Sequence, residues 1–289
     1  MRKLLITDLD NTLYNLIDYF GPSFRGMVHA LSRKTKIQEE VLLVDFKKVF
    51  LKRESLEYGF SVQELDAFKS FSAEEKLSLI KLAKGAFKRG RDKYLKPYAN
   101  VKDTLDWLTQ HSVIIVGVSN APFYNAQIRL KQLHLDKYFY GLAAREDLYL
   151  PDDEYSQDIN RKISVNKYES KRIQKKWKLT KKQMKPNIYA YKKVMEDLEI
   201  SPENTYVIGD SIAKDIQPAI EIGAKGIFAK YGEKNEKKNL DTVLSMTNWS
   251  KSEIEKVFFE KHKEPDLIAD DFSDLKNIIK VEHPQLPLF

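Results

Sequence analysis

Five short apolar runs divide the chain, and they constrain the fold more than any other feature. They are residues 4–6, 113–118, 205–209, 226–229 and 266–269. Unbroken rather than alternating apolar runs are typical of strands that are buried on both faces of a parallel sheet. Helical patterns follow the runs, so the sequence predicts an α/β fold built on a Rossmann-like parallel sheet. Three runs lead into Asp or Ser, at the strand ends where a parallel sheet binds ligands.

The long segment between the first two runs contains no convincing strand. Amphipathic patterns predict helices over residues 20–34, 37–53, 62–71 and 73–93. Ser72 can cap the last of these, with Glu75 completing a capping box. We therefore expect a helical cap domain, residues 15–96, inserted into an α/β core formed by residues 1–14 and 97–289.

Composition excludes several classes of protein. A hydrophobic fraction of 42%, with 15 Phe and 15 Tyr, excludes disorder over most of the chain. The strongest apolar run, residues 113–118, is far shorter than the roughly 20 residues that cross a bilayer. The absence of Cys excludes disulfides, thiolate metal sites and a Cys nucleophile. Asp8 and Asp10 interrupt any signal-peptide core, so we expect a cytoplasmic protein without a membrane partner.

Asp8 and Asp10 lie two residues apart after the first predicted strand. Two such carboxylates repel each other unless a cation lies between them, and a hard divalent cation with oxygen ligands would satisfy both. Taken alone this pattern is weak, because a turn with an Asp helix cap would give the same residues.

Three further polar clusters end strands or begin helices of the same predicted sheet. They are Ser119-Asn120, Lys185 before Pro186, and Gly209-Asp210-Ser211 with Asp215. Since all of them belong at the carboxyl edge of one sheet, we expect them to converge with Asp8 and Asp10.

The four clusters, in this order, resemble the motifs of the haloacid dehalogenase superfamily of phosphohydrolases. The match covers residues 1–140 and 185–230 well, and a helical insertion between the first two motifs resembles the C1-type cap of one subfamily. The runs 10–14 and 57–59 are also similar to the pyrimidine 5′-nucleotidase branch.

The resemblance implies a nucleophile, an acid–base group and a metal. Asp8 would attack phosphorus to give an aspartyl-phosphate, and Asp10 would protonate the leaving oxygen and then activate water. Mg²⁺ would be held by Asp8, the backbone carbonyl of Asp10 and Asp210, with Asp215 close by. Asp215 could equally brace its loop.

The resemblance also implies a phosphate site formed by Ser119, Asn120 and Lys185, although Asn120 could be only a turn residue at a strand end. Dehalogenases of this superfamily lack an acid at the position of Asp10. The expected reaction is therefore phosphoryl transfer to water or, in a phosphomutase, to another hydroxyl.

The substrate class is less defined than the reaction. The nucleotidase similarity favours a nucleotide or another small phosphorylated metabolite. Tyr14, Tyr19, Phe20 and Tyr58 could stack on a base, or they could pack the cap against the core.

Basic residues are concentrated in an insertion at about residues 145–184. The net charge of the chain is +7, yet residues 161–185 alone hold eleven Lys and Arg residues against one acid, Glu169. Tyr168 and Trp177 lie among the cations, so residues 161–182 could bind nucleic acid. A solvated Lys-rich helical face would explain the same pattern, and so would attraction of small anions.

The C-terminal tail, residues 281–289, suggests a partner. Its last five residues, from Gln285 to Phe289, resemble the peptide by which bacterial replication and repair proteins dock on the sliding clamp. The tail could instead fold back onto the core. Together with the basic segment it motivates a DNA-associated phosphatase as an alternative. A binding protein without turnover is a third hypothesis, which the complete set of motif residues opposes.

Overall fold

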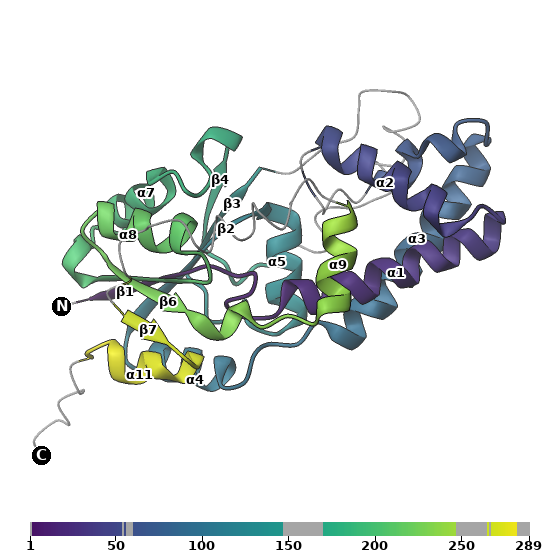
Figure 1. Cartoon of the computed structure of the whole chain (residues 1–289). Helices are drawn as coiled ribbons and strands as arrows, with labels where there is room; N and C mark the ends of the chain where they lie inside the picture. Colours follow the sequence, from purple (N-terminus) through teal and green to yellow (C-terminus); the bar gives the residue numbers. More distant parts are fainter. Residues whose placement is uncertain are drawn as a thin grey trace, which may run out of the picture.

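The fold is that of a computed structural model, which describes residues 2–53, 55, 60–146, 170–246, 265 and 267–281. Seven parallel strands form one sheet in the order β4-β3-β2-β1-β5-β6-β7 (Figure 1). The strands are β1 (Lys3–Thr7), β2 (Val113–Pro122), β3 (Gly141–Arg145), β4 (Lys175–Leu179), β5 (Thr205–Gly209), β6 (Lys225–Ala229) and β7 (Leu267–Ala269). The predicted α/β fold with a Rossmann-like parallel sheet is confirmed.

All five predicted strands are present, as β1, β2, β5, β6 and β7. The sequence analysis missed β3 and β4. The predicted alternative of a Lys-rich helical face is wrong for residues 175–179, which form an edge strand. Trp177 and Leu179 are buried there while the lysines between them are exposed, and lysine on an edge strand discourages pairing with another chain.

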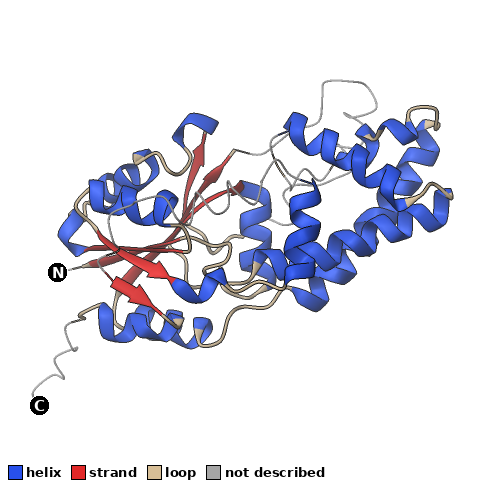
Figure 2. Ribbon diagram, viewed as in Figure 1, coloured by secondary structure: helices blue, strands red, loops and turns tan. Residues whose placement is uncertain are grey.

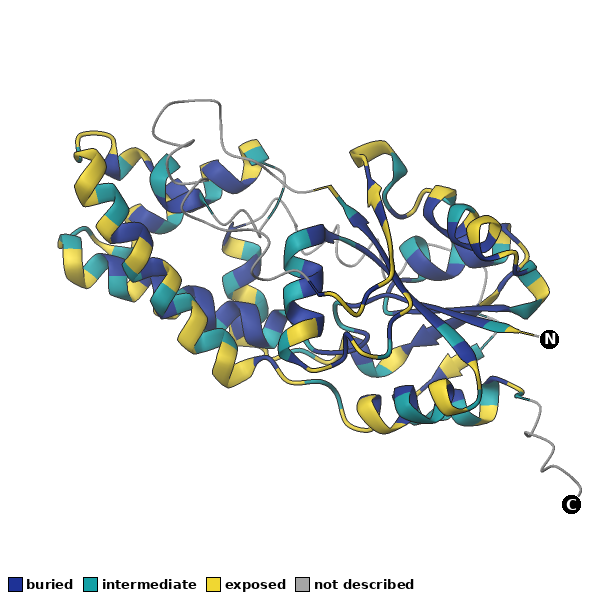
Figure 3. Ribbon diagram, turned by 180° about the vertical axis from the view of Figure 1, so that it is seen from behind, coloured by how far each residue is buried: buried dark blue, intermediate teal, exposed yellow. Residues whose placement is uncertain are grey.

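Helices cover both faces of the sheet (Figure 2). The helices α7 (Tyr189–Leu198) and α8 (Gln217–Glu221) lie on one face, where they contribute to a core with Leu4 and Ile6. The helices α4 (Val101–Gln110), α5 (Phe123–Gln132) and α11 (Leu275–Ile278) contribute to the core that contains Leu5. Neighbouring residues of β1 thus point to opposite faces, and the strands are buried on both (Figure 3).

Three long helices lie between β1 and β2, at one end of the sheet (Figure 1). They are α1 (Leu16–Thr35), α2 (Glu39–Arg53) and α3 (Ala73–Tyr94), and the Ser72–Glu75 capping box begins α3 as predicted. The expected helix over residues 62–71 is wrong. Two short 3₁₀ turns replace it, because Leu65 is extended and the Ala67 amide donates to Oδ2 of Asp45 at 2.7 Å instead of to a helical carbonyl.

The helix α9 (Lys237–Met246) follows β6 in sequence but packs against α1 and α2 (Figure 1). Arg25 of α1 donates to Asn239 Oδ1 at 2.7 Å and to Thr242 Oγ1 at 2.6 Å. Asp18 Oδ1 accepts hydrogen bonds from the Glu236 amide and from Asn239 Nδ2, both at 3.0 Å. A segment from the second half of the chain therefore forms part of the helical layer at the end of the sheet.

Three parts of the sequence analysis lie outside the described residues: the first part of the basic segment (161–169), the tail from Gln285 to Phe289, and Tyr58. Within the described ranges, no helix is long and apolar enough to span a bilayer.

Candidate active site

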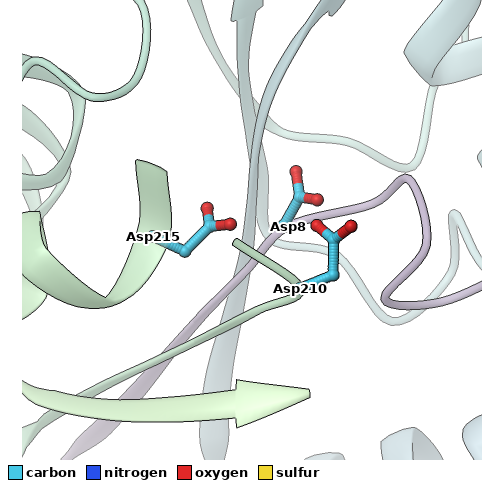
Figure 4. Close-up of side chains that lie close together, drawn as sticks. All are labelled: Asp8, Asp210 and Asp215. Atoms are coloured by element: carbon cyan, nitrogen blue, oxygen red, sulfur yellow. The ribbon is translucent and has the colours of Figure 1, made fainter. Parts of the chain in front are cut away.

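Three aspartates meet at the carboxyl edge of the sheet (Figure 4). Asp8 follows β1, Asp210 follows β5, and Asp215 lies in the turn of helix Ile212–Ile216. Because β1 and β5 are adjacent and parallel, their ends bring Asp8 and Asp210 together. One carboxylate oxygen from each of the three residues lies within 4.8 Å of the others. The predicted convergence is therefore observed for these residues.

Close approach of Asp215 depends on the residue that ends β5. A Cβ atom at Gly209 would lie 2.2 Å from Cγ of Asp215, so only glycine leaves room for this carboxylate. Asp215 Oδ2 accepts a hydrogen bond from the Ser211 amide at 3.3 Å, and Oδ1 accepts one from the Tyr191 hydroxyl at 3.2 Å. The aspartate braces its loop and faces the other two carboxylates at the same time.

Lys185 is the cation at the centre of the cluster. Its Nζ donates to Asp8 Oδ1 at 2.5 Å and to Asp215 Oδ1 at 2.6 Å. Asn120 holds the Lys185 backbone, because its Oδ1 accepts from the Lys185 amide at 2.9 Å and its Nδ2 donates to the Lys185 carbonyl at 2.8 Å. Both polar ends of Asn120 are thus engaged in placing Lys185, and its predicted contact with phosphate stays a prediction.

Burial and like charge control the protonation of the aspartates. Burial raises the pKa of Asp8 well above its ordinary value; the Lys185 ammonium opposes this rise, while Asp215, Asp210 and Asp10 add to it. Burial and the neighbouring Asp215 raise the pKa of Asp210 to about 7. Burial alone would lower the pKa of Lys185, but the two carboxylates raise it, so the lysine stays charged.

Asp10 and Ser119 lie beside the cluster. The Asp10 side chain is 19% exposed, so it can reach a bound molecule, and its carboxylate forms an ion pair with Nη2 of Arg129 at 3.3 Å. Ser119 is buried near the end of β2, and its Oγ accepts a hydrogen bond from the Ala121 amide at 3.1 Å. Within the part of the chain that the structure describes, the Ser119 hydroxyl donates no hydrogen bond, so its proton could serve a bound oxyanion.

The charges and donor atoms fit a divalent cation. Lys185 pairs with Asp8 and Asp215, and Arg129 pairs with Asp10. Together with Asp210, the four aspartates and these two cations carry a charge of −2 when all six groups are ionised. A hard dication with oxygen ligands balances that charge. The residues Asp8, Asp210 and Asp215 are therefore able to hold Mg²⁺.

Two residues of this region were missed in the sequence analysis. Asn11 has a φ of 55° and donates from Nδ2 to Asp210 Oδ2 at 3.2 Å, joining the first motif to the last. Arg129 lies on the buried side of α5, between Ala126 and Leu130. Its position was detectable, because a cation among the apolar positions of an amphipathic helix indicates a buried ionic partner.

The aromatic residues suggested for base stacking are packed instead. Tyr14, Tyr19 and Phe20 are all buried, and Phe20 contacts Phe24 and Phe87 of the helical layer. The alternative in the sequence analysis, that these rings pack the inserted helices against the core, describes their arrangement.

Comparison with known families gives a match over most of the chain. A model of haloacid dehalogenase-like hydrolases matches residues 2–223, and a model of HAD-hydrolase-like proteins matches residues 184–275. No match was found among curated proteins.

Several solved structures share the fold. A HAD phosphatase from Thermococcus onnurineus is 18% identical, with 98% of this chain and 100% of that chain covered and a TM-score of 0.54. A 2-haloacid dehalogenase from Pseudomonas syringae pv. Tomato DC3000 is 16% identical, with 96% and 98% covered and a TM-score of 0.54. A HAD-hydrolase from Bacillus subtilis bound to magnesium is 14% identical, with 97% and 99% covered and a TM-score of 0.50. At these identities the likeness establishes the fold alone.

Proposed function

This chain belongs to the haloacid dehalogenase-like hydrolases, and from that premise we propose that it is a Mg²⁺-dependent phosphomonoester hydrolase acting through an aspartyl-phosphate. The observation that carries the proposal is the partly exposed acid Asp10 beside the buried nucleophile candidate Asp8. Halide leaves carbon without a proton, whereas the oxygen of a phosphate ester leaves more readily when an acid protonates it. An acid at this place therefore favours ester hydrolysis over dehalogenation.

In the first step an Asp8 carboxylate oxygen forms a bond to phosphorus, and the bond from phosphorus to the ester oxygen breaks. Asp10 gives its proton to the departing oxygen, which leaves as an alcohol. Lys185 keeps Asp8 oriented and ionised within the buried cluster, because its ammonium lies 2.5 Å from Asp8 Oδ1.

In the second step water attacks the aspartyl-phosphate, and Asp10 accepts the proton of that water. The bond between phosphorus and the Asp8 oxygen breaks, so inorganic phosphate leaves and the Asp8 carboxylate is restored. Ser119, Lys185 and, in this proposal, Asn120 hold the phosphoryl oxygens. Asp8, the Asp10 carbonyl and Asp210, with Asp215 beside them, would hold Mg²⁺, which when bound offsets the negative charge of the phosphoryl group.

The helices of residues 15–96 would serve as a C1-type cap over this edge of the sheet, so the cap would set specificity. We propose a small phosphorylated metabolite as the substrate, with nucleotides first in the panel. The burial of Tyr14, Tyr19 and Phe20 removes one argument for a nucleotide, so the panel includes sugar phosphates as well.

The test is release of p-nitrophenol from p-nitrophenyl phosphate, with Mg²⁺ or with EDTA. Asp8→Asn should abolish turnover, and Asp10→Asn should lower it by about 10²- to 10⁴-fold. Asp103→Asn, a change in the first turn of α4, is the matched control and should leave turnover unchanged. Full activity in Asp8→Asn would overturn the proposal.

A second candidate, a phosphatase that acts on nucleic acid, is favoured by the exposed cations of β4. Lys176 and Lys178 are exposed on the edge strand, a few residues before Lys185. Because residues 175–179 belong to the sheet, deleting the segment would damage the fold, so the sharper test is the double change Lys176→Gln and Lys178→Gln. Binding of single-stranded DNA should then weaken and its dependence on salt should become shallower. Unchanged DNA binding would exclude this candidate, as would no DNA binding by the unaltered protein.

A further inference from the structure

Arg129 is among the largest fully buried side chains of the described residues, and it lies against the acid–base candidate. It is only 2% exposed, while its partner Asp10 is 19% exposed. Its Nη2 lies 3.3 Å from both Oδ1 and Oδ2 of Asp10. A bound substrate could therefore reach Asp10 but could not reach the guanidinium.

The rest of the guanidinium is held from the first inserted helix. Nη1 donates to the Tyr19 hydroxyl of α1 at 3.1 Å, and Cζ lies 5.6 Å from the centre of the Tyr14 ring. These contacts fix the plane of Arg129, since the planar guanidinium has few orientations that satisfy both an oxygen and an aromatic ring. The nitrogen that faces Asp10 thus has a defined position.

A buried arginine is costly to keep, because moving a charge out of water is unfavourable unless a partner compensates it. The chain keeps this one among the buried residues Ala126 and Leu130 of α5, a place where an apolar side chain would pack well. The other cation of α5, Lys131, is exposed. The ion pair with Asp10 explains why an arginine occupies this position, whereas packing alone does not.

We infer that Arg129 is a positioning residue, which fixes the orientation of the Asp10 carboxylate for proton transfer to the leaving oxygen. The inference rests on the proposed function, because it assigns Asp10 the role of general acid. Arg129 does not exchange a proton and does not touch the substrate. It holds the carboxylate through Nη2, which limits the orientations that Asp10 can take while it donates its proton.

Leaving-group dependence tests this role. An alkyl ester needs protonation of its oxygen far more than p-nitrophenyl phosphate does, because p-nitrophenolate is a stable anion. We expect Arg129→Met to lower kcat/KM for ethyl phosphate by about 10²-fold, the lower range for general acid catalysis. The fall for p-nitrophenyl phosphate should stay below about 10-fold. Arg129→Lys retains the charge without the planar guanidinium, so its selective loss should be smaller, at about 10-fold.

Two controls separate positioning from damage to the fold. Arg25→Met removes the hydrogen bonds from α1 to α9 without touching Asp10, and it should affect both esters equally. Tyr19→Phe removes the acceptor of Nη1 but keeps the Asp10 pair, so its loss should be selective for ethyl phosphate and smaller than that of Arg129→Met. Thermal unfolding confirms that each variant is folded, and Arg129→Lys decides the matter where Arg129→Met does not fold.

Equal losses for the two esters in both Arg129 variants would overturn the positioning role and leave the phosphatase proposal intact. Failure of the unaltered protein to hydrolyse either ester with Mg²⁺ would overturn the two together. A selective loss with ethyl phosphate is the result that supports the inference.

Discussion

Lys185→Met removes the ammonium that compensates two buried carboxylates. The side chains of Asp8 and Asp215 are 7% and 2% exposed, so water cannot replace the lost partner. Breaking a buried ion pair by removing one side costs about 3–5 kcal/mol of the free energy of unfolding. This is a large part of the roughly 5–15 kcal/mol that stabilises a typical domain.

Lys193→Met is the matched control, since Lys193 pairs with Asp197 at 2.9 Å but is 41% exposed. An exposed pair contributes little to stability, because water screens both charges. The assay is urea unfolding of the metal-free protein in EDTA at pH 8, with both variants and the unaltered chain. Lys185→Met should cost about 3–5 kcal/mol, and Lys193→Met should cost clearly less.

The same unfolding experiment at pH 5 shows whether the destabilisation caused by Lys185→Met grows or shrinks as the pH falls. Burial already raises the pKa of Asp8, and loss of Lys185 raises it further, so the Asp8 carboxylate of the variant takes up a proton as the pH falls. A neutral acid needs no counter-charge, and the cost of Lys185→Met should therefore shrink toward pH 5. A cost below about 1 kcal/mol at pH 8 would refute the view that Lys185 compensates ionised carboxylates.

Four other outcomes are expected. Mg²⁺ at about 100 times its Kd should stabilise the protein by about 2.7 kcal/mol, and Asp210→Asn should reduce this gain in thermal unfolding; equal gains would exclude Asp210 as a ligand. Gly209→Ala should cost about 1–3 kcal/mol in urea unfolding, because its Cβ would lie 2.2 Å from Cγ of Asp215. The lysines that face Asp66 lower its pKa to about 2, so its stabilising effect is present above pH 4 and is lost as the pH falls toward 2; Asp66→Asn should remove that part of the acid dependence. Deleting residues 285–289 should end binding to a sliding clamp and leave turnover unchanged, and retained clamp binding would contradict the proposed docking peptide.

The strands that carry the motifs were predictable because local pattern alone defines them. The runs before Asp8 and Asp210 are apolar on both faces of the sheet, and continuous apolar runs indicate that environment without any knowledge of distant contacts. Motif order along the chain then implies convergence, because parallel strands end at one edge. The three aspartates meet for that reason.

The strand β4 was not predictable by the same route. In its sequence, Lys-Lys-Trp-Lys-Leu, only Trp177 and Leu179 are buried. The lysines are exposed because β4 is an edge strand, and it becomes one only by pairing with β3. Trp177 Nε1 donates to Asp197 Oδ2 at 2.9 Å, a partner in α7. Tertiary contacts of this kind decide β structure more often than local preference does.

The partners of Arg129 were equally hidden from the sequence. The position of a buried cation can be read from the helical pattern of α5, but its contacts with Asp10 and Tyr19 join residues 119 and 110 positions away in the chain. No local pattern encodes such a pairing. Asn11 and Asp210 are joined across 199 positions in the same way.

The packing of α9 on α1 also means that α1 is translated long before the helix that covers it. The ribosome completes α1 at Thr35, yet the residues that cover one side of this helix, such as Asn239 and Val243, are made near the end of the chain. A nascent chain that stops before residue 237 lacks Asn239, which approaches α1 so closely that a Cβ atom at Gly21 would lie 3.1 Å from its Cα. The first helical layer to be translated is thus among the last parts to be finished.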